Sequence, residues 1–166
     1  MSIDPANLPY RPCVGIMVFD RRHQVWIGRR VGSPNQHSPG GWWQMPQGGI
    51  DAGEAPAAAA MRELGEETGM RSARIAAESA HWHTYDLPPE LAGRVWQGRY
   101  RGQTQKWFAL EFTGDPREID ISARDGHAAE FDQWRWAGID ELLGLIVPFK
   151  RAVYEQVIAE FRHLAA

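Results

Sequence analysis

The sequence predicts one domain of the mixed α/β (α+β) class. Its 166 residues are the length of a single ordinary domain, and we expect that domain to span residues 1–166. Strand-like segments separated by turns fill much of the chain, and two segments carry a helical pattern. With 43% hydrophobic and 23% charged residues, the composition is that of a globular protein and excludes disordered, collagen-like and coiled-coil chains.

The first elements are two β-rich runs, Val14–Phe19 and Gln24–Arg29, separated by a short polar turn. This pattern is typical of a β-hairpin. Residues 31–53 are then rich in Gly, Pro, Ser and Asn, which predicts a long loop with a possible short strand at Trp43–Met45. Loops of this length commonly bind ligands.

The clearest helix is predicted over Pro56–Thr68. Proline suits the first turn, an alanine run follows, and Gly69 is a typical residue just after a helix end. Ala55 stands where a capping Ser or Thr is usual, so we expect Pro56 and packing to hold this turn instead.

Three further strands and a terminal helix complete the expected order. Arg74–Tyr85, Gln105–Thr113 and Phe131–Trp136 have the composition or alternation of strands, and residues 86–102 form an excursion that contains Pro and Gly. Pro148–Leu164 carries an apolar stripe at helical spacing.

The charge of the chain and its lack of targeting features limit its expected partners and location. A net charge of −3 and a pI near 6.1 give no overall attraction to nucleic acid, so any RNA contact requires a local basic patch. No apolar run reaches the roughly 18 residues of a membrane span, and the N-terminus lacks the pattern of a secretory signal. The single cysteine, Cys13, fits a reducing compartment. We therefore expect a cytoplasmic protein.

Three glutamates share one face of the predicted helix. Glu63, Glu66 and Glu67 lie at i, i+3 and i+4, where like charges repel, and a divalent cation would relieve that repulsion. Oxygen-only ligands favour magnesium or manganese over zinc. For the three glutamates alone, a solvated acidic helix face is a simpler explanation than a metal site. The preceding segment, residues 46–49, favours a site because its glycines allow the backbone to approach a metal or phosphate closely.

The loop and the helix together satisfy a longer motif, G-x5-E-x7-R-E-U-x-E-E-x-G-U, where U is a bulky aliphatic residue. Its fixed positions are Gly48, Glu54, Arg62, Glu63, Leu64, Glu66, Glu67, Gly69 and Met70. This segment, residues 48–70, resembles the complete Nudix box, and nine fixed positions make it a specific signal.

The resemblance implies a fold, a reaction and a set of residues. Nudix proteins are α/β/α sandwiches around a mixed sheet, and their box glutamates bind two or three magnesium or manganese ions for the hydrolysis of phosphoanhydride bonds. The implied catalytic residues are Glu63, Glu67 and Arg62, with Arg62 orienting the carboxylates. The implied metal ligands are Gly48, Glu63, Glu66, Glu67 and Glu130. Whether Glu63 is the general base or a further ligand stays open.

The resemblance extends beyond the box to one branch of that family. Tyr10–Pro12, Trp43–Ile50, Gln105–Phe108 and Phe149–Lys150 are similar to bacterial RNA pyrophosphohydrolases and to asymmetric diadenosine tetraphosphate hydrolases, and Thr84–Pro89 resembles the latter in particular. The implied substrate-binding residues are Arg11, Arg29, Arg30, Gln47, Tyr85, Gln105, Lys106, Phe149 and Lys150. Strand alternation indicates that only one of the two neighbouring arginines, 29 and 30, faces the site.

The expected function is the removal of pyrophosphate from the 5′-triphosphate end of RNA, which promotes its decay. The alternative is hydrolysis of diadenosine tetraphosphate to ATP and AMP. A non-catalytic nucleotide-binding module would be expected to lack box glutamates, and a general nucleoside-triphosphate or nucleotide-sugar pyrophosphatase has no support from the flanking motifs. We expect a 5′-triphosphorylated RNA or a dinucleoside polyphosphate as partner, with no membrane and no DNA sequence recognition; the sequence indicates no particular protein partner.

Overall fold

A computed structural model describes residues 4–32, 41–124 and 126–165. Residues 33–40 of the predicted loop lie outside this range. Within these ranges, eight strands form one sheet: β1 (Tyr10–Phe19), β2 (Val25–Arg30), β3 (Trp43–Gln44), β4 (Gln47–Gly49), β5 (Ala73–Glu78), β6 (His83–Asp86), β7 (Gly102–Phe112) and β8 (Phe131–Ala137). The α-helices are α1 (Pro56–Thr68), α2 (Leu142–Leu145) and α3 (Arg151–Phe161).

The centre of the sheet is the parallel pair of β1 and β7, which stay in register from Tyr10 opposite Gly102 to Phe19 opposite Glu111. All other strand pairs are antiparallel, so the sheet is mixed as expected. The strands of the predicted hairpin do pair, but only at their adjoining ends, where Phe19 faces Val25. β2 instead pairs along its length with β8.

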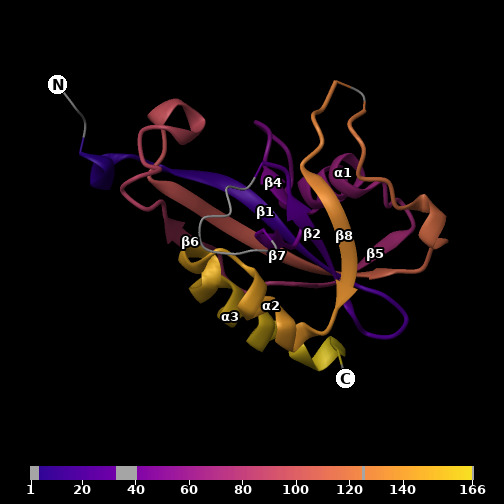
Figure 1. Cartoon of the computed structure of the whole chain (residues 1–166). Helices are drawn as coiled ribbons and strands as arrows, with labels where there is room; N and C mark the ends of the chain where they lie inside the picture. The colour runs from indigo at the N-terminus through magenta and orange to yellow at the C-terminus, as the bar shows by residue number, and fades with distance from the viewer. Residues whose placement is uncertain (1–3, 33–40, 125, 166) are drawn as a thin grey trace.

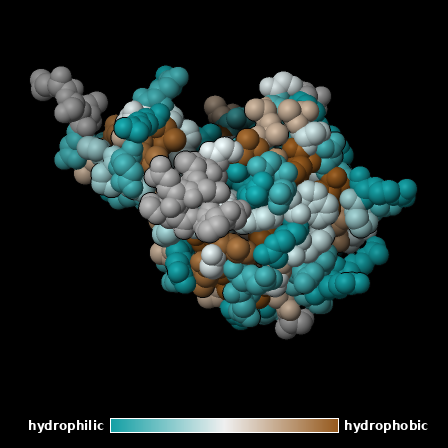
Figure 2. Space-filling model, viewed as in Figure 1, coloured by the Kyte–Doolittle hydropathy of each residue, from teal (hydrophilic) through white to brown (hydrophobic). Residues whose placement is uncertain are grey.

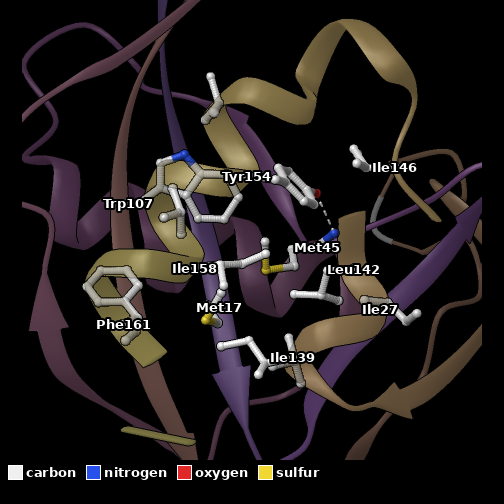
Figure 3. Packing of buried hydrophobic residues seen from close by; sticks show 14 of the residues in the cluster. Met17, Ile27, Met45, Trp107, Ile139, Leu142, Ile146, Tyr154, Ile158 and Phe161 are labelled. Carbon is white, nitrogen blue, oxygen red and sulfur yellow. Dashed lines mark hydrogen bonds between the residues drawn. The ribbon is translucent and has the colours of Figure 1, made fainter. Parts of the chain in front are cut away.

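Helices cover both faces of this sheet, with α1 on one side and α2 and α3 on the other (Figure 1). The side chains of β1 divide between the two layers because successive strand residues point to opposite faces. Val14 and Ile16 pack in the cluster that contains Leu64 of α1. Met17 packs in the cluster that contains Ile158 of α3 (Figure 3). The expected sandwich is confirmed.

Helix α1 has the bounds that its sequence predicts. Pro56 occupies its first turn, and Gly69 ends it in a left-handed conformation at φ 75°, with its N–H donating to the Gly65 carbonyl. Ala55 has the extended conformation of an N-cap but no capping side-chain hydrogen bond. The helix is therefore held by its buried alanines and Leu64 rather than by a side-chain cap.

Several elements differ from the expectation. The run over residues 74–85 is two strands, β5 and β6, because the chain bends between them and β6 pairs with the opposite end of β7. The terminal helix is divided into a 3-10 turn at Pro148–Lys150, helix α3 and a 3-10 turn at Arg162–Ala165. The short elements β4 and α2 have no clear sequence pattern.

The face of the molecule seen in Figure 2 is a mixture of hydrophilic and hydrophobic residues. Across the described ranges, no helix is both long enough and apolar enough to cross a membrane.

Candidate active site

A cleft of about 320 Å³ opens beside β4 and the C-terminal half of α1. Its lining comes from segments far apart in the sequence, including β1, β4, α1, β6 and the turn before α3. Ten of the predicted site residues line it: Arg11, Arg30, Gln47, Gly48, Glu63, Glu67, Tyr85, Glu130, Phe149 and Lys150. The fold thus brings acids, bases and aromatic rings around one space.

Arg62 organises the acidic part of the site. Its Nε donates to Glu54 at 2.8 Å, its Nη1 to Glu63 at 3.0 Å, and its Nη2 to the Gly49 carbonyl at 2.8 Å. The Nη1 group also lies 3.2 Å from Glu66. A planar guanidinium can hold several oxygens in fixed directions at once, which a lysine cannot. Arg62 is therefore a positioning residue that fixes the helix carboxylates against β4.

Gly48 allows the backbone of β4 to lie directly against Glu63. A side-chain carbon at Gly48 would overlap the Glu63 carboxyl group. Next to it, the Gln47 N–H donates to Glu67 at 3.3 Å. The glycine is required here by the close approach of backbone and carboxylate.

The carboxylates inside the cleft are poorly solvated and repel one another. Burial raises the pKa of Glu67 well above its usual value, and the charges of Glu130 and Glu63 raise it further. Burial also raises the pKa of Glu63, although Arg62 opposes this shift. A cation bound among these groups would stabilise their charged forms.

The donor set fits a hard divalent cation. All candidate groups are oxygens, which suits magnesium or manganese. Within the described ranges, no three acidic, histidine or cysteine side chains converge tightly enough to hold an ion by themselves. Magnesium typically uses one or two carboxylates and takes its other ligands from water, backbone or substrate phosphates. Glu63, Glu67 and the Gly48 carbonyl could supply the protein's share.

Two basic and two aromatic residues form another part of the lining. Lys150 is buried, and burial together with the charge of Arg30 lowers its pKa to about 7. Its ammonium lies 5.8 Å from the centroid of Tyr85 and 6.0 Å from that of Phe149. The two rings are themselves 5.6 Å apart at 44°. Positive charge beside aromatic rings suits a ligand that carries both phosphate and base.

The other five predicted residues do not line this cleft. Arg29 forms an ion pair with Asp132 at 2.7 Å, so Arg30 is the neighbour that faces the site, as alternation predicts. Lys106 lies over the ring of Trp82. The remaining three are Arg62, Glu66 and Gln105.

Gln105 and Glu66 lie outside the lining in different ways. Gln105 is buried and donates to Gln47 and Gln103, so it contributes to the polar network around the site. Glu66 turns instead toward Arg62 and a second cavity of about 200 Å³, where His127 lies 3.6 Å away.

Sequence reasoning missed six lining residues. They are Gly49, Leu87, Leu91, Val95, Trp96 and Gln103. Four of them belong to the excursion after β6, whose proline and glycine content predicts only a loop. Trp96, an aromatic residue in a segment that otherwise predicts a loop, is the sequence feature that could have indicated a binding role.

Comparison with known proteins identifies this arrangement. A model of the family described as NUDIX domain matches residues 9–157. The chain belongs to the NUDIX family. It is thus a hydrolase that acts on phosphoanhydride bonds, and members of this family use divalent metal ions.

Individual relatives agree with this assignment. An RNA pyrophosphohydrolase of Brucella ovis is 58% identical over 167 aligned residues, which cover 99% of this NUDIX chain and 94% of the relative. The solved structure of the E. coli dihydroneopterin triphosphate pyrophosphohydrolase has a TM-score of 0.64 at 20% identity, covering 92% of this chain and 99% of that one. A C. elegans Ap4A hydrolase has a TM-score of 0.57 at 14% identity, covering 91% and 98%. The two structures support the fold.

Proposed function

We propose that this protein removes pyrophosphate from the 5′-triphosphate end of RNA. The observation that carries the proposal is the 58% identity, over nearly the full length, to an RNA pyrophosphohydrolase. The cleft supports it, since carboxylates, basic residues and aromatic rings line the same space. We propose a cytoplasmic location, which an RNA substrate and the single cysteine of the chain, Cys13, support.

Different residues of the cleft bind the phosphate groups, stack on a base and position the carboxylates. Arg11, Arg30 and Lys150 attract the phosphate groups, and Phe149 stacks on a base, supported by the ring of Tyr85, which is buried in the core. Arg62 keeps the carboxylates in place, so little reorganisation is needed when substrate arrives.

Glu63, Glu67, Glu130 and the Gly48 carbonyl are the groups that would hold magnesium or manganese, with Glu66 joining them if its side chain turns away from Arg62. Two or three such ions, when bound, offset the phosphate charge that repels a nucleophile and make water more acidic. Glu63 lies against β4 and can accept the proton of the attacking water.

One observation favours a second candidate, the hydrolysis of diadenosine tetraphosphate to ATP and AMP. The segment that resembles diadenosine tetraphosphate hydrolases, Thr84–Pro89, contributes Tyr85 and Leu87 to the cleft. Both reactions break the same kind of bond, so they can share one catalytic centre.

A side-by-side measurement separates the two. The wild-type protein is given triphosphorylated RNA and diadenosine tetraphosphate with magnesium, and kcat/KM and the products are determined for each. We expect a higher kcat/KM on RNA, with release of pyrophosphate or of successive phosphates. A higher kcat/KM on diadenosine tetraphosphate, with ATP and AMP as products, would contradict the proposal and support the alternative.

A further inference from the structure

The segment between β6 and β7, residues 87–101, forms one wall of the cleft, and the proposed function gives no role to its tryptophan, Trp96. It projects as a coiled loop at one end of the molecule, near the N-terminus (Figure 1). Leu87, Leu91, Val95 and Trp96 from this segment line the cleft. Among the described residues, Trp96 belongs to neither hydrophobic cluster, so core packing does not account for it.

The backbone at this tryptophan is strained. Trp96 has φ 51° and Gln97 has φ 60°, two successive non-glycine residues in the left-handed region. Backbone hydrogen bonds hold the segment, with the Val95 N–H donating to the Leu91 carbonyl and the Arg99 N–H to the Trp96 carbonyl. Such strain persists only where the surrounding structure imposes it, and it is common at ligand-binding positions. Here it coincides with a side chain that lines the cleft.

Arg11 connects this tryptophan to the acidic part of the site. Its guanidinium carbon lies 5.5 Å from the centroid of the Trp96 ring. A side chain at Gly49 would clash with Arg11, so the arginine also lies against β4. Trp96 and Tyr100 also form a T-shaped contact, with ring centroids 6.2 Å apart at 79°. A partly exposed ring that is held by a cation and by a second aromatic ring is a preorganised stacking surface.

We propose that Trp96, held by Arg11, is a second stacking surface for a nucleobase. The first is Phe149, supported by the ring of Tyr85, and both come from other segments of the same cleft. Phosphate held by Arg11 brings an attached nucleoside next to the indole. The cleft therefore selects substrates that carry two bases on one phosphate-linked chain. This inference rests on the proposed function, because it concerns how the same site recognises its substrate.

Kinetics on one-base and two-base substrates test the inference. The substrates are ATP, the triphosphorylated dinucleotide pppApA and diadenosine tetraphosphate; ATP is measured as a competitive inhibitor if its cleavage is slow. The variants are Trp96→Leu, Trp96→Phe and, as a matched control, Trp82→Leu, which changes a tryptophan that is 44% exposed and outside the cleft.

The Trp96→Leu variant should lower the ratio of the two-base kcat/KM to the ATP value, which is kcat/KM or, for ATP as an inhibitor, 1/Ki. We expect a decrease of about tenfold, mainly through KM, because one stacked base is lost. Trp96→Phe should restore most of the ratio, and Trp82→Leu should keep it. An equal loss on ATP and on the two-base substrates, or no loss on either two-base substrate, would overturn the inference. Failure of the proposed function would give a different result, because the wild type would then cleave diadenosine tetraphosphate but not pppApA. The role of Trp96 would in that case be measured with diadenosine tetraphosphate.

Discussion

At the scale of single residues, the site depends on close contacts that fix the positions of its carboxylates. The contact between Gly48 and Glu63 is the clearest case, since the carboxyl group occupies the space that a side chain at position 48 would need. Arg62 is another, because it joins the box glutamates to the backbone of β4. Small changes at these two residues should therefore have large effects on activity.

Gly48→Ala should lower kcat by about 100-fold while the protein stays folded. The added methyl group would push the flexible end of Glu63 aside, and a displacement of about 1 Å of a catalytic group has an effect of that size. Steady-state kinetics and thermal melting measure the two effects. Gly144→Ala is the matched control, because a side-chain carbon there meets open space. Normal kcat in Gly48→Ala would show that the position of Glu63 does not matter.

Arg62→Lys should impair both stability and activity. Lysine cannot bond Glu54, Glu63 and the Gly49 carbonyl at once, so we expect a loss of about 1–3 kcal/mol in the free energy of unfolding. Activity should fall by roughly 10–100-fold, as for other residues that orient metal ligands. Urea denaturation and kinetics check the two expectations.

Arg117→Lys is the control for that variant, because Arg117 is 91% exposed and pairs with Asp115 at the surface. If Arg62→Lys behaved like this control, Arg62 would have no positioning role.

At the scale of elements, helix α1 carries most of the motif, yet its N-terminus lacks a side-chain cap. Ala55 already has the extended backbone of a capping residue. Ala55→Ser should therefore raise the free energy of unfolding by about 1 kcal/mol, because a hydroxyl can accept from a free N–H of the first turn. Ala58→Ser, at an exposed position inside the helix, should lower it slightly. Denaturation midpoints that move in the same direction for both variants would rule out this explanation.

The elements also show what sequence patterns can and cannot predict. Helix α1 is predicted to the residue because proline, alanine and glycine act locally. β4 escapes prediction because its three residues form a strand only through antiparallel pairing with β1, a long-range contact. The strand run over residues 74–85 is divided for a similar reason, since β5 and β6 pair with different parts of β7. In the same way, motif matching predicts that Glu67 belongs to the site but does not predict Trp96. The tryptophan reaches the cleft only through the fold of its loop.

At the scale of the whole molecule, the fold brings carboxylates of α1 close to Glu130, and their mutual repulsion opposes folding. Magnesium should therefore raise the melting temperature. Magnesium at a concentration about tenfold above its Kd should raise the free energy of unfolding by about 1.4 kcal/mol. For a chain of this size, this corresponds to a rise of about 3–5 °C in the melting temperature. The shift should be much smaller in Glu67→Gln, which removes one of the predicted ligands, and unchanged in Glu78→Gln, an exposed glutamate of β5. An equal shift in all three proteins would indicate non-specific binding.

The most direct test of the account is pyrophosphate or phosphate release from triphosphorylated RNA with magnesium, measured for the wild type, Glu67→Gln and Glu78→Gln, with circular dichroism to confirm folding. We expect the wild type and Glu78→Gln to release product at similar rates. Glu67→Gln should be slower by several orders of magnitude and folded, because it loses a carboxylate at the centre of the cleft. Near-normal release by folded Glu67→Gln would contradict the assignment of the site, and no release by the wild type would contradict the proposed substrate.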